Sequence, residues 1–199
     1  MNIINQLLAL DLSLLEWART LVSPEYALLV QISGELVVIY GAILLVALWL
    51  YGVYQRDNDY KRIALAIFIT IVSVFVLYAI INLGLHKWRP GATEIVGAIA
   101  PLIPHPIDNS FPSGHALFTG ALLVGLFRYL RQTGLIGITT IIALITLTAR
   151  VLGGVHYPGD IIGGLIFGAL GAYLIRPVVD HIVLTISPII IRIASWVRL

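Results

Sequence analysis

Five segments of this chain are long and apolar enough to cross a lipid bilayer, and no other feature restricts its fold as strongly. A transmembrane helix needs roughly 20 mostly apolar residues, and the segments that approach this length are 36–54, 63–85, 114–130, 134–149 and 161–177. The chain is 59% hydrophobic and only 11% charged, whereas a soluble domain has about 25% charged residues. The sequence therefore predicts an all-α integral membrane protein, a helical bundle that forms a single domain over residues 1–199.

The two ends of the chain differ from these five spans. Residues 3–22 combine an apolar stripe with charged side chains that need water, so we expect an interfacial or partly inserted helix within residues 1–33. Residues 36–177 then form the catalytic bundle. The C-terminal helix within residues 178–199 has a proline and an arginine in an otherwise apolar run. It is either a sixth span or a helix on the membrane surface.

Basic residues between the spans indicate the orientation, because cytoplasmic loops are enriched in Lys and Arg. If the spans alternate in direction, the more basic face holds Arg56, Lys61, Arg62, Arg128, Arg131 and Arg176. The opposite face carries fewer basic residues and the long, proline-rich loop 86–111. We therefore expect this loop to face outward from a cell membrane that the chain crosses several times.

Four segments with chemically active side chains converge on the outward face. Arg89 follows the second span, Ser113 precedes the third and Arg150 follows the fourth. His156 and Asp160 lie at the start of the fifth span. We therefore expect these residues to form one cluster at a similar depth in the bundle.

The segment Pro112-Ser113-Gly114 and the two arginines have the properties of an anion site. Free backbone N–H groups and the positive end of the helix dipole attract anions at a helix start, and glycine permits close approach of the backbone. Arg89 and Arg150 add planar, permanently charged groups that suit phosphate oxygens. A serine before a helix is often only a cap, but beside two arginines and two histidines we favour phosphate binding.

His156, Asp160 and His115 supply the remaining groups for phosphoryl transfer. His156 and Asp160 are spaced i, i+4, so one helix face can hold both. A carboxylate on one ring nitrogen leaves the other nitrogen free to attack or to take a proton, and His115 can protonate a leaving group. An anion cradle, a nucleophile and a general acid together predict phosphoryl transfer through a phosphohistidine.

The same residues resemble the three signature motifs of the type 2 phosphatidic acid phosphatase (PAP2) superfamily of integral membrane lipid phosphatases. In this chain the motifs are Arg89-Pro90, Pro112-Ser113-Gly114-His115, and Arg150 with His156 and Asp160. The resemblance implies a six-helix bundle with His156 as nucleophile, Asp160 as its partner and His115 as acid. It also implies a phosphate site that needs no metal or cofactor, made by Arg89, Ser113, Gly114 and Arg150.

Two positions depart from the usual motifs. The first motif is usually K-x6-R-P, and this chain has Asn82 in place of the lysine; the third usually begins Ser-Arg, and this chain has Ala149. The missing lysine removes a cation that would hold phosphate. His86 lies on nearly the same helical face as Asn82, and Lys87 follows it. Our hypothesis is that His86 or Lys87 replaces part of the lost charge.

The approach to the second motif, LIPHPIDNSFPSGHA over residues 102–116, resembles a narrower branch, the bacterial undecaprenyl pyrophosphate phosphatases of the bacitracin-resistance type. We therefore expect a hydrolase that converts undecaprenyl pyrophosphate, a membrane lipid, to undecaprenyl phosphate. Phosphatidylglycerol phosphate, phosphatidic acid and lipid A phosphate are alternative substrates. A phosphotransferase, which passes the phosphoryl group to another lipid and not to water, is an alternative to a hydrolase. Asn82 and Ala149 keep open a different class, a catalytically weakened relative that binds or moves lipids.

Other features have simpler interpretations. A net charge of only +2 is too small for a nucleic-acid-binding protein, and the outward cluster has few carboxylates for a metal site. We expect Glu35 to be a helix-start residue at the surface, and His105 and Asp108 to serve loop structure or substrate gating. The glycines near Gly164 and Gly168 predict close helix packing. No oligomeric state is predicted.

Overall fold

The computed structural model describes residues 3–90, 101–105 and 108–196. Its helices are α1 (Ile3–Thr20), α2 (Ala27–Ser33), α3 (Leu36–Tyr54), α4 (Asn58–Gly84), α5 (Gly114–Gly125), α6 (Thr133–Leu152) and α7 (Pro158–Trp196). A 3-10 turn over Pro24–Tyr26 precedes α2, and a π-helical segment over Leu126–Leu130 extends α5. The long loop predicted over residues 86–111 therefore lies partly outside the described residues.

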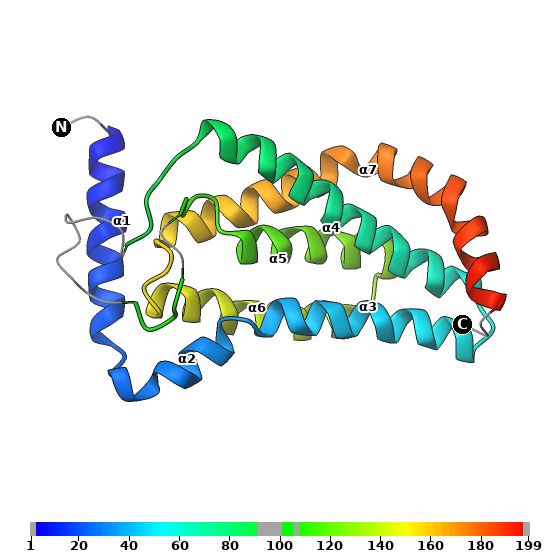
Figure 1. Cartoon of the computed structure of the whole chain (residues 1–199), viewed down its shortest axis with the longest axis horizontal. Coiled ribbons are helices and arrows are strands. Elements are labelled where there is room, and N and C mark those ends of the chain that lie inside the picture. Colours follow the sequence, from blue (N-terminus) through cyan, green and yellow to red (C-terminus); the bar gives the residue numbers. More distant parts are fainter. Residues whose placement is uncertain (1–2, 91–100, 106–107, 197–199) are drawn as a thin grey trace.

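Helices α3 to α7 form an elongated bundle, with α5 among the other helices (Figure 1). Within the described residues, four helical stretches are long and apolar enough to cross a membrane: Pro24–Tyr54, Asn58–Gly84, Thr133–Leu152 and Pro158–Trp196. The apolar stretch Gly114–Leu130 is shorter. It is buried along much of its length and packs mainly on α7 and α4. The all-helical membrane bundle predicted from the apolar segments is confirmed.

Polarity in the bundle is distributed as a lipid solvent requires. Large apolar side chains such as Ile43, Ile141 and Leu174 are exposed, whereas the hydroxyl side chains of Thr70 and Thr146 are buried. The buried hydroxyls find partners inside the protein: Thr70 donates to the carbonyl of Ala66 at 2.7 Å. Lipid offers no hydrogen bonds, so polar groups of a membrane protein must be satisfied internally.

Helix α1 crosses one end of the bundle and does not run parallel to the other helices (Figure 1). It contacts α6 and α7. Its Arg19 donates to the carbonyl of Leu152 at 2.7 Å, which satisfies a free carbonyl at the last residue of α6. The chain then turns through α2 and breaks at Gly34 and Glu35 before α3 begins. The interfacial location of residues 1–33 stays a prediction.

Helix α7 joins the predicted span 161–177 to the C-terminal segment as far as Trp196. Its 39 residues make it about 58 Å long at 1.5 Å per residue, which exceeds the thickness of a bilayer with its headgroups. Pro177 and Pro188 lie inside it, and Figure 1 shows its C-terminal part bending at the end of the bundle opposite α1. Within the described residues, 178–196 thus extend α7, without a turn that would separate them from it as a sixth span.

Candidate active site

A close contact between α5 and α7 brings two of the predicted motifs together. A Cβ added to Gly164 would lie 2.6 Å from the carbonyl oxygen of Ser113, and one added to Gly168 would collide with the carbonyl oxygen of Leu117. Only glycine permits such an approach between helices. At the end of this contact the N–H of Ser113 donates to the carbonyl of Asp160 at 3.1 Å. Glycine packing therefore holds the start of α5 against the start of α7.

His156 and Asp160 form a buried pair at the start of α7. His156 Nδ1 lies 3.5 Å from Asp160 Oδ2, and the two side chains are 2% and 0% exposed. A guanidinium nitrogen of Arg89 lies 3.1 Å from Nε2 and 3.5 Å from Nδ1, so it contacts the ring near both nitrogens. The Asp160 carboxylate can only accept, so its contact with Nδ1 places the ring proton on Nδ1. This tautomer presents Nε2 as the nitrogen with the free lone pair, which is the form a nucleophile needs.

The charge state of His156 agrees with this tautomer. Burial is the strongest influence on the ring and lowers its pKa to about 4, although the hydrogen bond to Asp160 opposes the shift. The positive charges of Arg89 and Arg150 lower the pKa of His156 further. At neutral pH the ring is therefore uncharged and its lone pair is available.

Several donors hold the carboxylate of Asp160. It accepts hydrogen bonds from the backbone N–H of Tyr157 at 2.9 Å, from Lys87 Nζ at 2.8 Å and from the hydroxyl of Ser110. Ser110 is itself fully buried, and its Oγ lies 3.5 Å from His156 Nδ1. Sequence reasoning missed Ser110, because a loop serine outside a regular element has no periodicity that reveals its partner.

Helix α1 contributes Asp11 to the same network. Asp11 Oδ2 accepts from Lys87 Nζ at 2.6 Å, and its Oδ1 accepts from the backbone N–H of Gly159 at 2.7 Å. The carboxylate thereby satisfies one of the free N–H groups in the first turn of α7. In the sequence Asp11 is only a charge that needs water, since 148 positions separate it from Gly159.

Two buried polar atoms near the pair have no hydrogen-bond partner in the part of the chain that the structure describes: Ser113 Oγ and Arg150 Nε. Ser113 occupies the N-cap position of α5, but its hydroxyl makes no capping bond. Gly114 begins α5, and the start of a helix attracts anions. Leaving a buried donor unsatisfied costs about 1–3 kcal/mol. These donors therefore indicate a ligand site, and their charge and geometry suit a phosphate.

The second histidine, His115, lies in the first turn of α5 and pairs with Glu35. Its Nε2 is 3.0 Å from Glu35 Oε2, and the other carboxylate oxygen accepts from Arg150 at 2.8 Å. Glu35 is the N-cap residue of α3, as a helix-start residue should be, but its side chain makes no capping bond. Sequence reasoning missed this contact, because the only signal is one acidic residue before an apolar span.

Asn82 stands in place of the motif lysine, and His86 and Lys87 are the candidate replacements for its charge; these three residues have different surroundings. Lys87 lies in the cluster, between Asp11 and Asp160. His86 is exposed, and its ring packs edge-on against the neighbouring tryptophan at 4.4 Å between centroids. Asn82 accepts a hydrogen bond from an asparagine of the loop before α5. The structure thus brings Lys87 to the site, leaves His86 outside it and uses Asn82 to hold the loop.

Arg89 is held by loop residues as well as by the site. Its Nε donates to Asp108, and another guanidinium nitrogen donates to the carbonyl of Val155 at 2.9 Å. His105 Nδ1 lies 3.8 Å from the same Asp108 carboxylate. Asp108 and His105 therefore contribute to the position of Arg89, in keeping with the loop role predicted for them.

A histidine–aspartate pair, a second histidine and two arginines lie together at one end of a membrane bundle, and these are the groups that a membrane enzyme acting on phosphate esters would use. The PAP2 superfamily profile matches residues 87–183, a range that contains all three motifs. The chain belongs to the PAP2 superfamily, and it is an enzyme of this phosphatase type.

One curated relative agrees with this assignment, and two solved structures share the fold. The chain is 31% identical over 176 residues to undecaprenyl-diphosphatase BcrC of Bacillus subtilis strain 168, covering 85% of this chain and 86% of the relative. Its fold is similar to the crystal structure of a transmembrane PAP2 type phosphatidylglycerolphosphate phosphatase from Bacillus subtilis, with a TM-score of 0.68 and 20% identity over 89% of this chain and 88% of that one. Aquifex aeolicus LpxE gives a TM-score of 0.60 and 23% identity over 83% and 93% of the two chains.

Proposed function

We propose that the protein hydrolyses a lipid phosphate or diphosphate through a phosphohistidine on His156. The observation that carries this proposal is the environment of His156 Nε2. This nitrogen lies in a buried, uncharged ring, 3.1 Å from a guanidinium nitrogen of Arg89, while Asp160 faces the opposite ring nitrogen. A phosphate oxygen bound by Arg89 would bring phosphorus next to the attacking nitrogen.

In this proposal the phosphate is held by Arg89, Arg150, Ser113 and the start of α5 at Gly114. The unpartnered Ser113 Oγ and Arg150 Nε would each donate to a phosphate oxygen. Charge-assisted hydrogen bonds of this kind are stronger than neutral ones. Their donors are fixed before the substrate arrives, which is how a site stabilises the charge of a phosphoryl transition state.

The reaction has two displacements at phosphorus. In the first, His156 Nε2 forms a bond to phosphorus, the bond from phosphorus to the leaving oxygen breaks, and His115 gives that oxygen a proton. In the second, a water oxygen attacks phosphorus and passes a proton to His115, and the nitrogen–phosphorus bond breaks to release phosphate. Asp160 holds the Nδ1 proton throughout and stabilises the positive ring of the phosphohistidine.

Lys87 is the residue that we propose as the partial replacement for the motif lysine. Its ammonium group donates to Asp160 and to Asp11, so it acts on the phosphate through the carboxylate that orients His156. His86 is exposed and drops out of this proposal. Lys87 is a positioning residue here and not a phosphate ligand.

Undecaprenyl diphosphate is the substrate that we propose first. The similarity to undecaprenyl-diphosphatase BcrC over most of both chains supports it. The chemistry supports it too, because attack on the terminal phosphorus expels a phosphate monoester, a far better leaving group than an alkoxide. Phosphatidylglycerol phosphate, phosphatidic acid and lipid A phosphate are the alternatives within the same chemistry.

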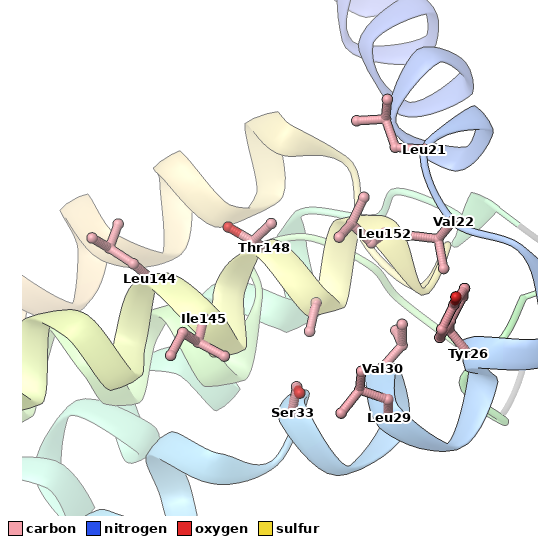
Figure 2. Close-up of a pocket in the computed structure, with 11 residues that line it drawn as sticks. Leu21, Val22, Tyr26, Leu29, Val30, Ser33, Leu144, Ile145, Thr148 and Leu152 are labelled. Atoms are coloured by element: carbon pink, nitrogen blue, oxygen red, sulfur yellow. The ribbon is translucent and has the colours of Figure 1, made fainter.

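An apolar cavity of about 520 Å³ beside the anion site supports a lipid substrate. Figure 2 shows side chains of α2 and α6 facing each other across it, with Leu21 and Val22 from the segment after α1 at one end. The lining includes Ser33 and Ala149, close in sequence to Glu35 and Arg150. We infer that the first isoprenoid units of the lipid bind here and that the substrate enters laterally from the bilayer.

Phosphate release in detergent with EDTA present tests the proposal. Wild type and His156→Ala are compared on undecaprenyl diphosphate, phosphatidylglycerol phosphate and phosphatidic acid, and an added lipid alcohol reveals transfer to an acceptor. We expect wild type to release phosphate from the diphosphate and His156→Ala to release none. Wild type should also become phosphorylated during turnover, and the phosphoryl–protein bond should be broken by acid and stable to base. If folded wild type releases phosphate from none of the lipids, the phosphatase proposal is wrong. The protein would then be a catalytically weakened relative that binds or moves lipids.

A further inference from the structure

We propose that Glu35 is a positioning residue for His115, and that the two form a second histidine–carboxylate pair that assists proton transfer to the leaving group. The inference rests on the proposed phosphatase function and extends it to a residue outside the three motifs. It is carried by the contact between Glu35, at the start of α3, and His115 on α5, two residues that are 80 positions apart in the sequence.

The hydrogen bonds of Glu35 determine which ring nitrogen of His115 does the work. A carboxylate only accepts, so the 3.0 Å contact between Glu35 Oε2 and His115 Nε2 requires a proton on Nε2. The nitrogen left to exchange a proton with the leaving oxygen is therefore Nδ1. In His156 the carboxylate faces Nδ1 instead, and Nε2 is the reactive nitrogen. The two histidines are thus oriented by two different carboxylates, one for attack and one for proton transfer.

The backbone around Glu35 is packed so that the carboxylate reaches the site. The N–H of Val37 donates to Thr146 Oγ1 at 3.1 Å, one helical turn before Arg150 on α6. A Cβ added to Gly34 would lie 3.4 Å from Arg150 Cδ, so the break between α2 and α3 lies directly against that arginine. Arg150 in turn donates to Glu35 Oε1 at 2.8 Å. The Glu35 side chain is 46% exposed, so its ionised form stays partly hydrated.

This arrangement has a chemical consequence that a merely structural contact lacks. A carboxylate on Nε2 stabilises the protonated ring and fixes its direction. The benefit to the rate is large when the leaving oxygen needs a proton and small when it leaves readily as an anion. The value of kcat/KM reports the first displacement, in which His115 acts as acid. Loss of the Glu35 charge should therefore harm poor leaving groups selectively.

The test compares two aryl phosphates that carry the same decyl chain, one without and one with a nitro group that improves the leaving group. Glu35→Gln, Glu35→Asp and a control, Glu25→Gln, are assayed beside wild type. Glu25 is exposed in the turn before α2, so the control removes a similar charge from the same region. We expect Glu35→Gln to lower kcat/KM on the poor leaving group about tenfold or more, a fraction of the whole effect of a general acid. We expect less than about threefold on the nitro compound.

Glu35→Asp should recover part of the loss on the poor leaving group, and the control should match wild type on both compounds. Equal losses on both compounds would show that Glu35 only maintains the fold or the arginine, and would overturn the proposal. A gain on both would show that Glu35 blocks the phosphate site, and would overturn it too. Wild type that releases phosphate from no substrate would instead remove the proposed phosphatase function itself.

Discussion

His156 has an ordinary side chain in an unusual setting, with a carboxylate facing Nδ1 and a guanidinium nitrogen close to both ring nitrogens. Its pKa is lowered to about 4 by burial, whereas an unfolded histidine has a pKa of about 6.5. As pH falls from 6.5 toward 4, the His156 ring becomes protonated in the unfolded chain but stays neutral in the folded chain. This residue therefore makes folding less favourable over that range. Above pH 6.5 the contribution is constant.

The unfolding temperature in detergent measures this effect. Between pH 7 and pH 5, wild type should lose more thermal stability than His156→Gln, which has no ring to protonate. The difference between the two proteins removes the contributions of the other titrating groups. Equal losses in the two proteins would mean that the folded ring has an ordinary pKa.

Ser113 tests the anion cradle at the scale of one hydroxyl. Its Oγ is buried and has no partner in the described part of the chain, so Ser113→Ala should not destabilise the fold. It should remove one hydrogen bond to phosphate, worth about 2 kcal/mol, and lower kcat/KM about thirtyfold. Phosphate-release kinetics and thermal unfolding of the same preparation separate the two effects. A loss of stability without a loss of kcat/KM would make Ser113 a helix cap.

At the scale of elements, the contact between α5 and α7 positions the motifs. Gly168→Ala adds a methyl group where it meets the carbonyl oxygen of Leu117, and overpacking of this kind costs about 1–3 kcal/mol. Because the same contact aligns Ser113 with Asp160, activity should fall along with the unfolding temperature. Gly137→Ala on α6 is the matched control, since nothing lies within 4 Å of the added Cβ. A variant at Gly168 that keeps wild-type stability and activity would refute this role for the contact.

Helix α1 completes the site from outside the bundle. Asp11→Ala removes the acceptor for the N–H of Gly159 and one partner of Lys87. Loss of a cap costs about 1 kcal/mol, and freeing Lys87 should disturb Asp160, so we expect lower stability and a severalfold lower kcat. Glu16→Ala, an exposed acidic residue on the same helix, should change neither. If Asp11→Ala behaves like Glu16→Ala in both assays, α1 is only packed on the site.

The bundle has two chemically different ends, and its orientation across the membrane is a property of the whole molecule. We propose that the end with the site and α1 faces outward. The chain contains no cysteine, so single cysteines at Glu25 and Asn58 can be labelled without background. In intact cells a membrane-impermeant maleimide should label Glu25→Cys and spare Asn58→Cys, and detergent lysis should expose both. The opposite pattern would place the site in the cytoplasm.

Much of this architecture could be predicted from the sequence. Lengths of apolar segments predicted the bundle, and alternation of spans predicted that Arg89, Ser113, Arg150 and His156 meet at one end. The continuous helix α7 was harder to predict, because two internal prolines suggest ends that the surrounding contacts override. The packing role of Gly164 and its neighbours was predictable from their spacing, but not the helix that they contact.

The sequence by itself determined that this protein resides in a membrane, that it is helical and which chemical groups its motifs supply. The lengths of apolar segments and the local spacing of residues are properties of the chain alone. Only the tertiary structure decided which carboxylates other than Asp160 reach the site. Asp160 is four positions from His156, but Glu35 and Asp11 reach the site from helices far away in the chain. A hydrogen bond depends on distance and direction in space, and no periodicity along a sequence encodes the partner of a residue on another helix.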